Sequence, residues 1–352
     1  MMYIRSTACI SPQKTFLETG LLADPADHAG NRLNCIEPDY KEFIDPKLIR
    51  RMSRIIKMGV AAGMACLKDG NTESPGAITT GTAYGCLEDT GVFLSKMVEQ
   101  HEELLTPTAF IQSTHNTIGA QIALQLHCNN YNNAFVHRGF SFESALLDGI
   151  LLLKEGEATN VLAGAIDEIT DKSHALLTRL GLYRNENNSS LSLLSPASKG
   201  TVNGEGAAFF LLSAESSADN LAKIDGLTTF YKPHNHEVVE EKITAFLAGH
   251  GLSVDDIDLV LTGRNGDLRH DAIFDHLDNT VFSNKPTAGF KQLCGEYPTA
   301  GAFAMWLAAN IIGQKTVPAV LGVMPAQQPV QRILIFNQYE NLQHSLFLVS
   351  AC

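Results

Sequence analysis

Apolar positions along the chain switch repeatedly between helical spacing and short continuous runs. Met52, Ile56, Val60 and Met64 recur at helical spacing and predict a helix over 49–67. Short apolar runs bounded by turn residues are typical of strands buried on both faces. By these patterns we predict helices over 49–67, 88–102, 113–127, 142–155, 238–249, 267–277 and 300–312, and strands over 76–85, 134–136, 160–165, 207–213, 222–231, 259–262, 280–282, 333–337 and 345–349.

The alternation of strands and helices occurs twice. It predicts an α/β fold with covered, largely parallel sheets. The chain has 352 residues, a length that suits one large domain or two fused domains. We expect two similar halves, 1–215 and 216–352, related by an internal duplication.

Composition narrows the classes of partner. Hydrophobic residues make up 45% and charged residues only 18%, which indicates a large interior or a large partner interface. The net charge of −12 argues against nucleic acid and anionic membranes as partners. No apolar run is long enough to span a membrane, and residues 1–14 lack the apolar core of a signal peptide, so we expect a cytoplasmic protein.

Cysteine usage gives no sign of a disulfide framework or a zinc site. The seven cysteines are odd in number and widely spaced, and no CxxC occurs. His234 and His236 resemble a pair of metal ligands, but the sequence offers no third one. We expect reduced thiols, no metal and no redox cofactor, with Asn235 or His236 capping the helix that follows.

A predicted strand-to-helix turn at HRGFSFE is the first candidate for chemistry. Its GFSFE differs from the GxSxG nucleophile elbow only at Glu143. Ser141 as a nucleophile would need a histidine and an acid, for which sequence position offers His137, His115 and Asp167. The alternative interpretation is that Ser141 caps the helix.

The spacing around this turn resembles that of the β-ketoacyl-acyl-carrier-protein synthases, the condensing enzymes of the thiolase fold. In that family a cysteine lies at such a turn, and a glycine precedes the next strand, which ends in an acidic residue. Here Gly156 precedes the strand NVLAGAIDE, which carries Asp167. The family spacing places Gly139 at the cysteine position, 17 residues before Gly156. The resemblance implies a five-layer αβαβα arrangement of two duplicated halves.

The family's first histidine begins an HGTxTxxGD motif after a strand. The corresponding stretch here is IDLVLTGRNGDLRHD. Gly263 takes the place of the histidine, and Asp271 matches the final aspartate.

The second histidine belongs to a KxxxGH motif before an apolar helix, which matches KQLCGEYPTAGAFAMW. Lys291 and Gly295 match, and Glu296 replaces the histidine. An alignment through Lys285 would place Phe290 there instead, but the spacing to the apolar helix favours Lys291. We expect Glu296 to be a structural partner of Lys291 or Arg264.

The resemblance therefore implies a family member whose catalytic positions hold Gly139, Gly263 and Glu296, so we expect no catalytic residue there. Residues 337–345, NQYENLQHS, replace the family's glycine-rich gating loop with bulky side chains. His137 and Arg138 would bind an acyl-chain end or a carrier phosphate, or else fill the vacated pocket or the dimer interface.

The stretch 106–124 is similar to short, divergent ketosynthase-like proteins of aryl-polyene pathways. Type II polyketide systems contain a chain-length factor that lacks the cysteine and pairs with a catalytic ketosynthase. The resemblance implies such a non-condensing subunit in acyl-carrier-protein-dependent polyene, polyketide or fatty-acid-like synthesis. Its partners would be a ketosynthase, or itself as a homodimer, and an acyl carrier protein. The strand at 133–136 would pair the two subunits edge to edge.

Three alternatives stay open at this point. The first is an acyltransferase or hydrolase that uses Ser141 on the same scaffold. The second is a weak decarboxylase that uses Glu296 as a base. The third is a purely structural homodimer.

Overall fold

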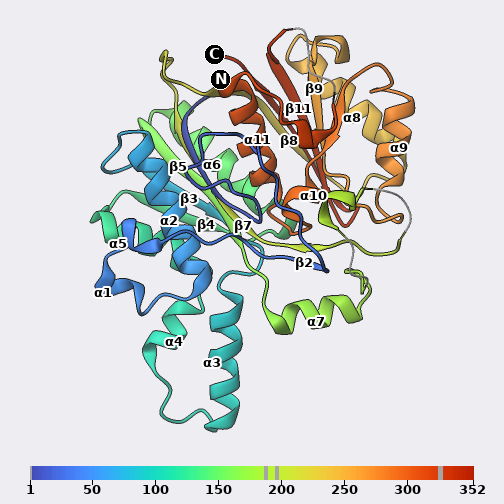
Figure 1. Cartoon of the computed structure of the whole chain (residues 1–352). Coiled ribbons are helices and arrows are strands. Elements are labelled where there is room, and N and C mark those ends of the chain that lie inside the picture. Colours follow the sequence, from blue (N-terminus) through green and yellow to red (C-terminus); the bar gives the residue numbers. More distant parts are fainter. Residues whose placement is uncertain (1, 186–188, 195–197, 324–327) are drawn as a thin grey trace.

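Ten strands connect into two matching five-stranded halves. The computed structural model describes residues 2–185, 189–194, 198–323 and 328–352 (Figure 1). The strand order is β10-β9-β11-β12-β8-β1-β7-β5-β3-β4, with a short pairing of β1 and β8 between the halves. The strands are β1 (Met2–Ile10), β3 (Ala77–Gly81), β4 (Tyr131–Phe135), β5 (Asn160–Asp167), β7 (Gly206–Ser213), β8 (Ala222–Tyr231), β9 (Leu259–Thr262), β10 (Thr287–Gly289), β11 (Arg332–Tyr339) and β12 (Gln343–Ser350).

The two halves have the same topology. In the first half β3 pairs in parallel with β4 and β5, and β5 pairs antiparallel with β7, which pairs with β1. In the second half β9, β10, β11, β12 and β8 repeat these relations in the same chain order. The two halves therefore have the matching topology that the predicted duplication implies. The division into domains at residue 215 stays a prediction.

Helices cover the sheets on both sides and also separate the two halves. The helices are α1 (Pro46–Ile49), α2 (Arg54–Asp69), α3 (Leu87–Glu99), α4 (Pro107–Gln112), α5 (Thr117–Leu126), α6 (Ser141–Glu155), α7 (Asp171–Arg179), α8 (His236–Gly249), α9 (Ala272–Asn279), α10 (Lys291–Cys294) and α11 (Gly301–Gln314). A two-stranded ribbon of β2 (Arg32–Leu33) and β6 (Asn203–Gly204) completes the described elements.

The interior has five layers. One apolar cluster joins α6 and α11 to inward side chains of both halves, among them Phe210 and Phe347. A second cluster packs α2 and α5 on the outer face of the first half, and a third packs α8 and α9 on the outer face of the second. The predicted thiolase-like αβαβα fold is confirmed, with Ala145, Leu146 and Ile150 of α6 buried between the halves.

Several predicted elements differ from the structure. The strand predicted over 280–282 is wrong, because the amide of Phe282 turns back to the carbonyl of Leu277 at 2.8 Å. The third strand of the second half is β10, which follows Pro286. The helices predicted over 49–67 and 267–277 begin later, at Arg54 and Ala272, because capping and turn residues precede them.

Among the described residues, no helix is both long and apolar enough to cross a bilayer.

Candidate functional site

The turn between β4 and α6 carries Gly139, the residue predicted at the position of the family's cysteine. Gly139 is buried in a single 3-10 turn that ends immediately before α6. The Ser141 hydroxyl accepts a hydrogen bond from the His137 amide at 2.8 Å and donates one to the Arg138 carbonyl at 2.8 Å. Arg138 takes a left-handed conformation, with φ of 50°. These two hydrogen bonds of the Ser141 side chain therefore stabilise the conformation of the turn.

The end of the β11–β12 hairpin fills the space in front of this turn. The Gln343 side chain accepts a hydrogen bond from the Gly139 amide at 3.0 Å and donates one to the His137 carbonyl at 3.0 Å. A Cβ added at Gly139 would lie 2.7 Å from the Tyr339 Cβ and 3.1 Å from the Gln343 Oε1. Real Cβ atoms essentially never approach other atoms as closely as the first of these distances. Packing therefore disfavours a side chain at Gly139, the residue that the family spacing predicts at the cysteine position.

The position of the first histidine is closed in a similar way. Gly263 follows β9, and its amide donates to the Phe336 carbonyl of β11 at 2.8 Å. A Cβ at Gly263 would collide with the side-chain oxygen of Asn337 and would lie 3.1 Å from the Asn337 Cα. The first residue of the bulky 337–345 stretch thus occupies the volume that a side chain at position 263 would enter.

The position of the second histidine forms part of a buried ion pair. The Lys291 amine contacts the two carboxylate oxygens of Glu296 at 2.9 and 2.8 Å, and both residues are buried. Lys291 also donates to the Gln338 carbonyl at 2.8 Å, and the Asn265 amide donates to Glu296 at 2.5 Å. Burial raises the pKa of Glu296, while Lys291 and Asn265 favour its ionised form. The predicted pairing of Glu296 with Lys291 is confirmed. Both carboxylate oxygens of Glu296 have hydrogen-bond partners.

Arg264 makes a separate cluster on the surface. It pairs with Asp275 at 2.6 Å and with Asp278 at 2.9 Å. The alternative pairing of Glu296 with Arg264 is therefore wrong.

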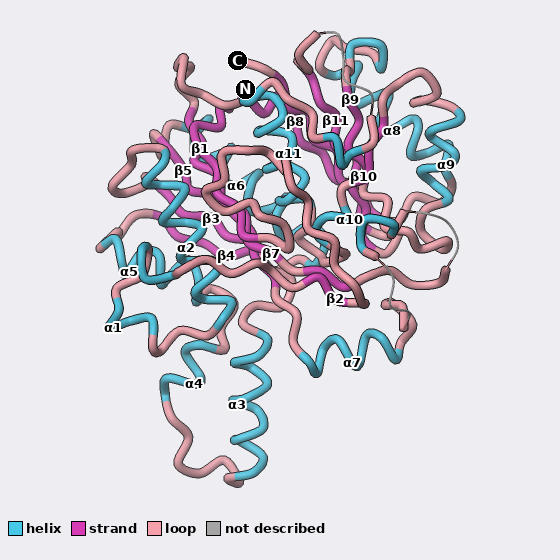
Figure 2. The backbone as a smooth tube through the Cα atoms, in the orientation of Figure 1, coloured by secondary structure: helices cyan, strands magenta, loops and turns pink. Residues whose placement is uncertain are grey.

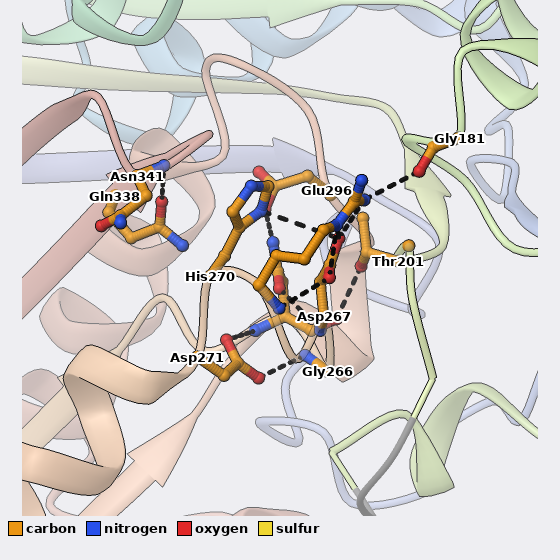
Figure 3. Close-up of polar contacts among 12 residues, drawn as sticks. Gly181, Thr201, Gly266, Asp267, His270, Asp271, Glu296, Gln338 and Asn341 are labelled. Carbon is orange, nitrogen blue, oxygen red and sulfur yellow. Dashed lines mark hydrogen bonds and ion pairs between the residues drawn. The ribbon is translucent and has the colours of Figure 1, made fainter.

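The loop between β9 and α9 is held by its own aspartates (Figure 3). The Asp271 carboxylate accepts hydrogen bonds from the amides of Asn265 at 3.0 Å and Gly266 at 2.7 Å. The carboxylate of Asp267 is bound by Arg269, whose guanidinium also donates to the Gly181 carbonyl at 2.7 Å. Asp271, the residue predicted to match the family's final aspartate, therefore stabilises the turn. It also fixes the loop from which the Asn265 side chain reaches Glu296.

Two further carboxyl groups lie in the interior between the halves. Asp167 accepts hydrogen bonds from the hydroxyls of Thr82 at 3.0 Å and Thr299 at 2.8 Å, and burial raises its pKa to about 6. Glu143 accepts one from the Ser345 hydroxyl at 2.8 Å, and burial raises its pKa to about 7. The sequence analysis missed Glu143 as a buried acid, although Leu146 and Ile150 follow it at helical spacing on the same face.

The residues proposed for a serine triad have separate partners. Ser141 Oγ bonds to backbone atoms of the turn, and Asp167 bonds to threonine hydroxyls and the Ala83 amide. His137 is exposed, with its ring packed edge-on against Phe140 at 5.5 Å. Phe140 occupies the N-cap position of α6, so the expectation that Ser141 caps the helix is wrong.

The remaining candidates lie at the surface. His137 and Arg138 are both exposed in the single chain, so they do not fill the space in front of Gly139, which Gln343 and Tyr339 occupy. Asn235 is the N-cap of α8, and its side chain accepts a hydrogen bond from the Val238 amide at 3.0 Å.

Comparison with known proteins places this arrangement in a family. The family model for the beta-ketoacyl synthase N-terminal domain matches residues 28–204. The chain belongs to the beta-ketoacyl synthase family. It is a divergent member of that family, and the assignment of Gly139 to the position of the catalytic cysteine stays a prediction.

Solved structures of beta-ketoacyl synthase proteins share the fold across the whole chain. The ishigamide ketosynthase/chain length factor matches with a TM-score of 0.82 and 18% identity, covering 100% of this chain and 99% of that chain. A type II PKS acyl-carrier protein in complex with its ketosynthase, AntDE:AntF, matches with a TM-score of 0.80 and 12% identity, covering 100% and 99%. The ketosynthase ApeO in complex with its chain length factor ApeC from Xenorhabdus doucetiae matches with a TM-score of 0.78 and 16% identity, covering 100% and 98%. No curated protein matches the sequence.

The closed turn makes the cysteine of other beta-ketoacyl synthases unfavourable in this chain. We expect Gly139→Cys to lower the free energy of unfolding by about 1–3 kcal/mol, because overpacking forces Tyr339 or the turn to move. Gly249→Cys is the matched control, since a Cβ there meets nothing within 4 Å. Urea denaturation of both variants measures the difference. Equal stability of the two variants would show that the turn has room for a side chain.

The buried acid of α6 gives a pH dependence with a definite sign. An unfolded glutamate loses its proton near its ordinary pKa, whereas the folded Glu143 keeps its proton up to about pH 7. The folded state therefore binds more protons in this window, and the wild type should lose stability relative to Glu143→Gln as the pH rises from about 5 to 7. We expect a relative loss of about 1–3 kcal/mol.

The control for this pH series is Glu241→Gln, on the exposed face of α8. Urea denaturation at several pH values gives the free energy of unfolding of all three proteins. A difference between wild type and Glu143→Gln that does not change with pH would mean that Glu143 is already ionised in the folded protein.

Proposed function

We propose that this chain is a non-condensing, chain-length-factor-type subunit that pairs with a catalytic ketosynthase. The pair would act in the cytoplasm, in acyl-carrier-protein-dependent polyene, polyketide or fatty-acid-like synthesis. The observation that carries the proposal is the closed turn at Gly139, where Tyr339 and Gln343 take the space of a nucleophile. A subunit that keeps the fold of a condensing enzyme and closes its site fits a role in assembly better than one in catalysis.

The loss of all three catalytic groups supports the same proposal. Condensation needs a thiolate at the turn and donors that stabilise the charge developing on the thioester oxygen, and loss of one such donor typically costs about 10²–10³-fold in rate. Gly139 and Gly263 offer no side chain, and Glu296 is neutralised by Lys291. Restoring one residue would leave the other two positions closed or occupied.

An open sheet edge supports a paired assembly. β4 is the last strand of its half and pairs only with β3 among the described strands. The Phe135 carbonyl accepts from the Thr82 amide at 3.0 Å, so this part of β4 is bound to the β3 side. The Ala134 amide instead donates to the side chain of the neighbouring Asn133 at 2.9 Å. A partner strand could replace that local bond with a ladder bond.

Apolar side chains surround this edge in the isolated chain. Tyr131 and Val136 flank β4, and Leu147 and Leu151 lie on the nearby α6; all four are exposed. Stable subunit pairs usually bury on the order of 2,000 Å² or more. Several solved relatives are described as ketosynthases with a chain length factor, which supports a ketosynthase as the partner.

The first test of the proposal is a proline in the free edge. Ala134→Pro removes the outward amide while the Phe135 carbonyl can still bond to the Thr82 amide. We expect association with a co-expressed, cysteine-bearing ketosynthase to weaken at least about tenfold, a change of about 1.4 kcal/mol. Ala134→Ser keeps the amide and is the control. Sedimentation analysis gives the affinities, and unaltered association of a folded Ala134→Pro variant would exclude edge pairing.

The second test looks for an acyl-enzyme. The isolated chain should stay at its unmodified mass after incubation with acyl-loaded carrier protein, because the turn has no nucleophile that a thioester can reach. Intact-mass spectrometry measures this, with Ser141→Ala as the control for the serine alternative. An acyl adduct that maps to Ser141 and disappears in Ser141→Ala would replace the proposed function with a serine acyltransferase or hydrolase.

A further inference from the structure

A helical arm projects from the body of the protein without an interior of its own. The arm consists of α3, α4 and their connection, residues 87–112, and extends beyond the layered body (Figures 1 and 2). No residue from 87 to 116 is buried. The rings of Phe93 and Phe110 hold the two helices together, with centroids 5.6 Å apart.

The bonds between the arm and the body lie near its base or along one side. The Thr90 hydroxyl donates to the Ser113 carbonyl at 3.2 Å, and the Lys172 amine donates to the Ser95 hydroxyl at 3.3 Å. Most stability of a helix in a protein comes from packing its apolar face. Because none of its residues is buried, the arm gains little stability from packing in the isolated chain. Contact with another protein surface would supply that packing.

The apolar side chains that would meet such a surface are present. Val98 is 76% exposed and Leu104 is 94% exposed, while Phe110 and Ile111 are each 57% exposed. Exposed apolar surface of this kind marks interaction sites in proteins, and these four large apolar side chains are all exposed on the arm. Along the chain, the arm is followed by α5 and then by β4. Leu124 of α5 is exposed as well.

The charge of the arm indicates which kind of surface it meets. It carries five acidic side chains and one basic one, a net charge of −4: Glu88, Asp89, Glu99, Glu102, Glu103 and Lys96. Since the whole chain has a net charge of −12, the remainder carries −12 − (−4) = −8. In a symmetric homodimer each acidic arm would meet a second acidic body. Like charges brought together at an interface are unfavourable, so a second copy is a poor occupant.

We propose that the arm of residues 87–112 docks in an apolar groove with a basic rim on an unlike subunit, and so selects a heterodimer over a homodimer. This inference rests on the proposed pairing with a ketosynthase and names the surface that makes the pairing specific. The β4 edge supplies backbone pairing that many strands could satisfy. The arm supplies the apolar area and the charge that distinguish one partner from another.

The test compares two variants with the same total change of charge. Glu102→Lys/Glu103→Lys changes the arm, and Glu237→Lys/Glu241→Lys changes α8 on the outer face of the second half; all four glutamates are exposed. Binding to a co-expressed, tagged ketosynthase that carries the Cys-His-His set is measured at about 0.05 M and about 0.5 M NaCl. We expect the arm variant to bind at least about tenfold more weakly at low salt and the α8 variant to stay within about twofold of wild type.

A second measurement tests the apolar face independently of charge. Val98→Ser/Leu104→Ser should weaken the complex without lowering the stability of the isolated chain, because both side chains are exposed. Hydrogen exchange should be fast in the arm of the isolated chain and slow in the complex.

The outcomes separate this inference from the proposed function. A wild-type chain that binds no ketosynthase overturns the proposed pairing and, with it, this choice of partner. A wild-type complex that the arm variants weaken no more than the α8 control overturns the role of the arm alone. A homodimer of the isolated chain with slow exchange in the arm would assign the groove to a second copy and overturn the heterodimer.

Discussion

The contact between the Gln343 side chain and the β4–α6 turn is the constraint on which the candidate site depends. Its amide bonds to the Gly139 amide and to the His137 carbonyl, each at 3.0 Å, while Tyr339 lies against the glycine. Tyr339 ends β11 and Gln343 begins β12, both in the second half, whereas the turn belongs to the first. Closing the site therefore also ties the two halves together. The fold itself closes the turn, and the glycine at position 139 fits this closed arrangement.

The side chains of Lys291, Glu296, Asn265 and Asp271 form a network in which each has a hydrogen-bond partner. Lys291 neutralises Glu296, and the Asn265 side chain donates a further hydrogen bond to Glu296. Asp271 accepts a hydrogen bond from the Asn265 amide and so fixes this loop. A buried ion pair contributes little net stability, because desolvation offsets most of the attraction. Losing one partner would nevertheless leave a buried charge alone, which is costly. The network is therefore suited to fixing a unique arrangement of the loops and poorly suited to proton transfer.

Much of this architecture could be predicted from local patterns. Apolar runs marked β7, β9 and β11, and helical spacing marked α6 and α11, because these elements are buried on most sides. The family spacing identified Gly139, Gly263 and Glu296. It could not show why glycine stays at position 139, since Tyr339 and Gln343 come from a hairpin about 200 residues away in the chain.

Other features could not be predicted, because the same residue at one position is compatible with two different structures. The short β10 was missed since three residues give no periodicity, and Ser141 resembled both a cap and a nucleophile. Glu143 resembled a surface charge, and only packing against the second half revealed it as a buried acid with a raised pKa. The arm of residues 87–112 gave a correct helical pattern in α3, but the pattern could not tell whether its apolar face is covered within the chain.

The most direct measurement of the central claim is the hydrogen exchange rate of the Gly139 amide in the isolated protein, resolved by NMR and compared with a Gln343→Ala variant. If the turn is closed, this amide exchanges only through large-scale opening in the wild type and much faster in the variant, which lacks its acceptor. Fast exchange of the Gly139 amide in the wild type, equal to that in the variant, would contradict the account. It would show that the hairpin leaves the turn open to solvent and that the site is accessible after all.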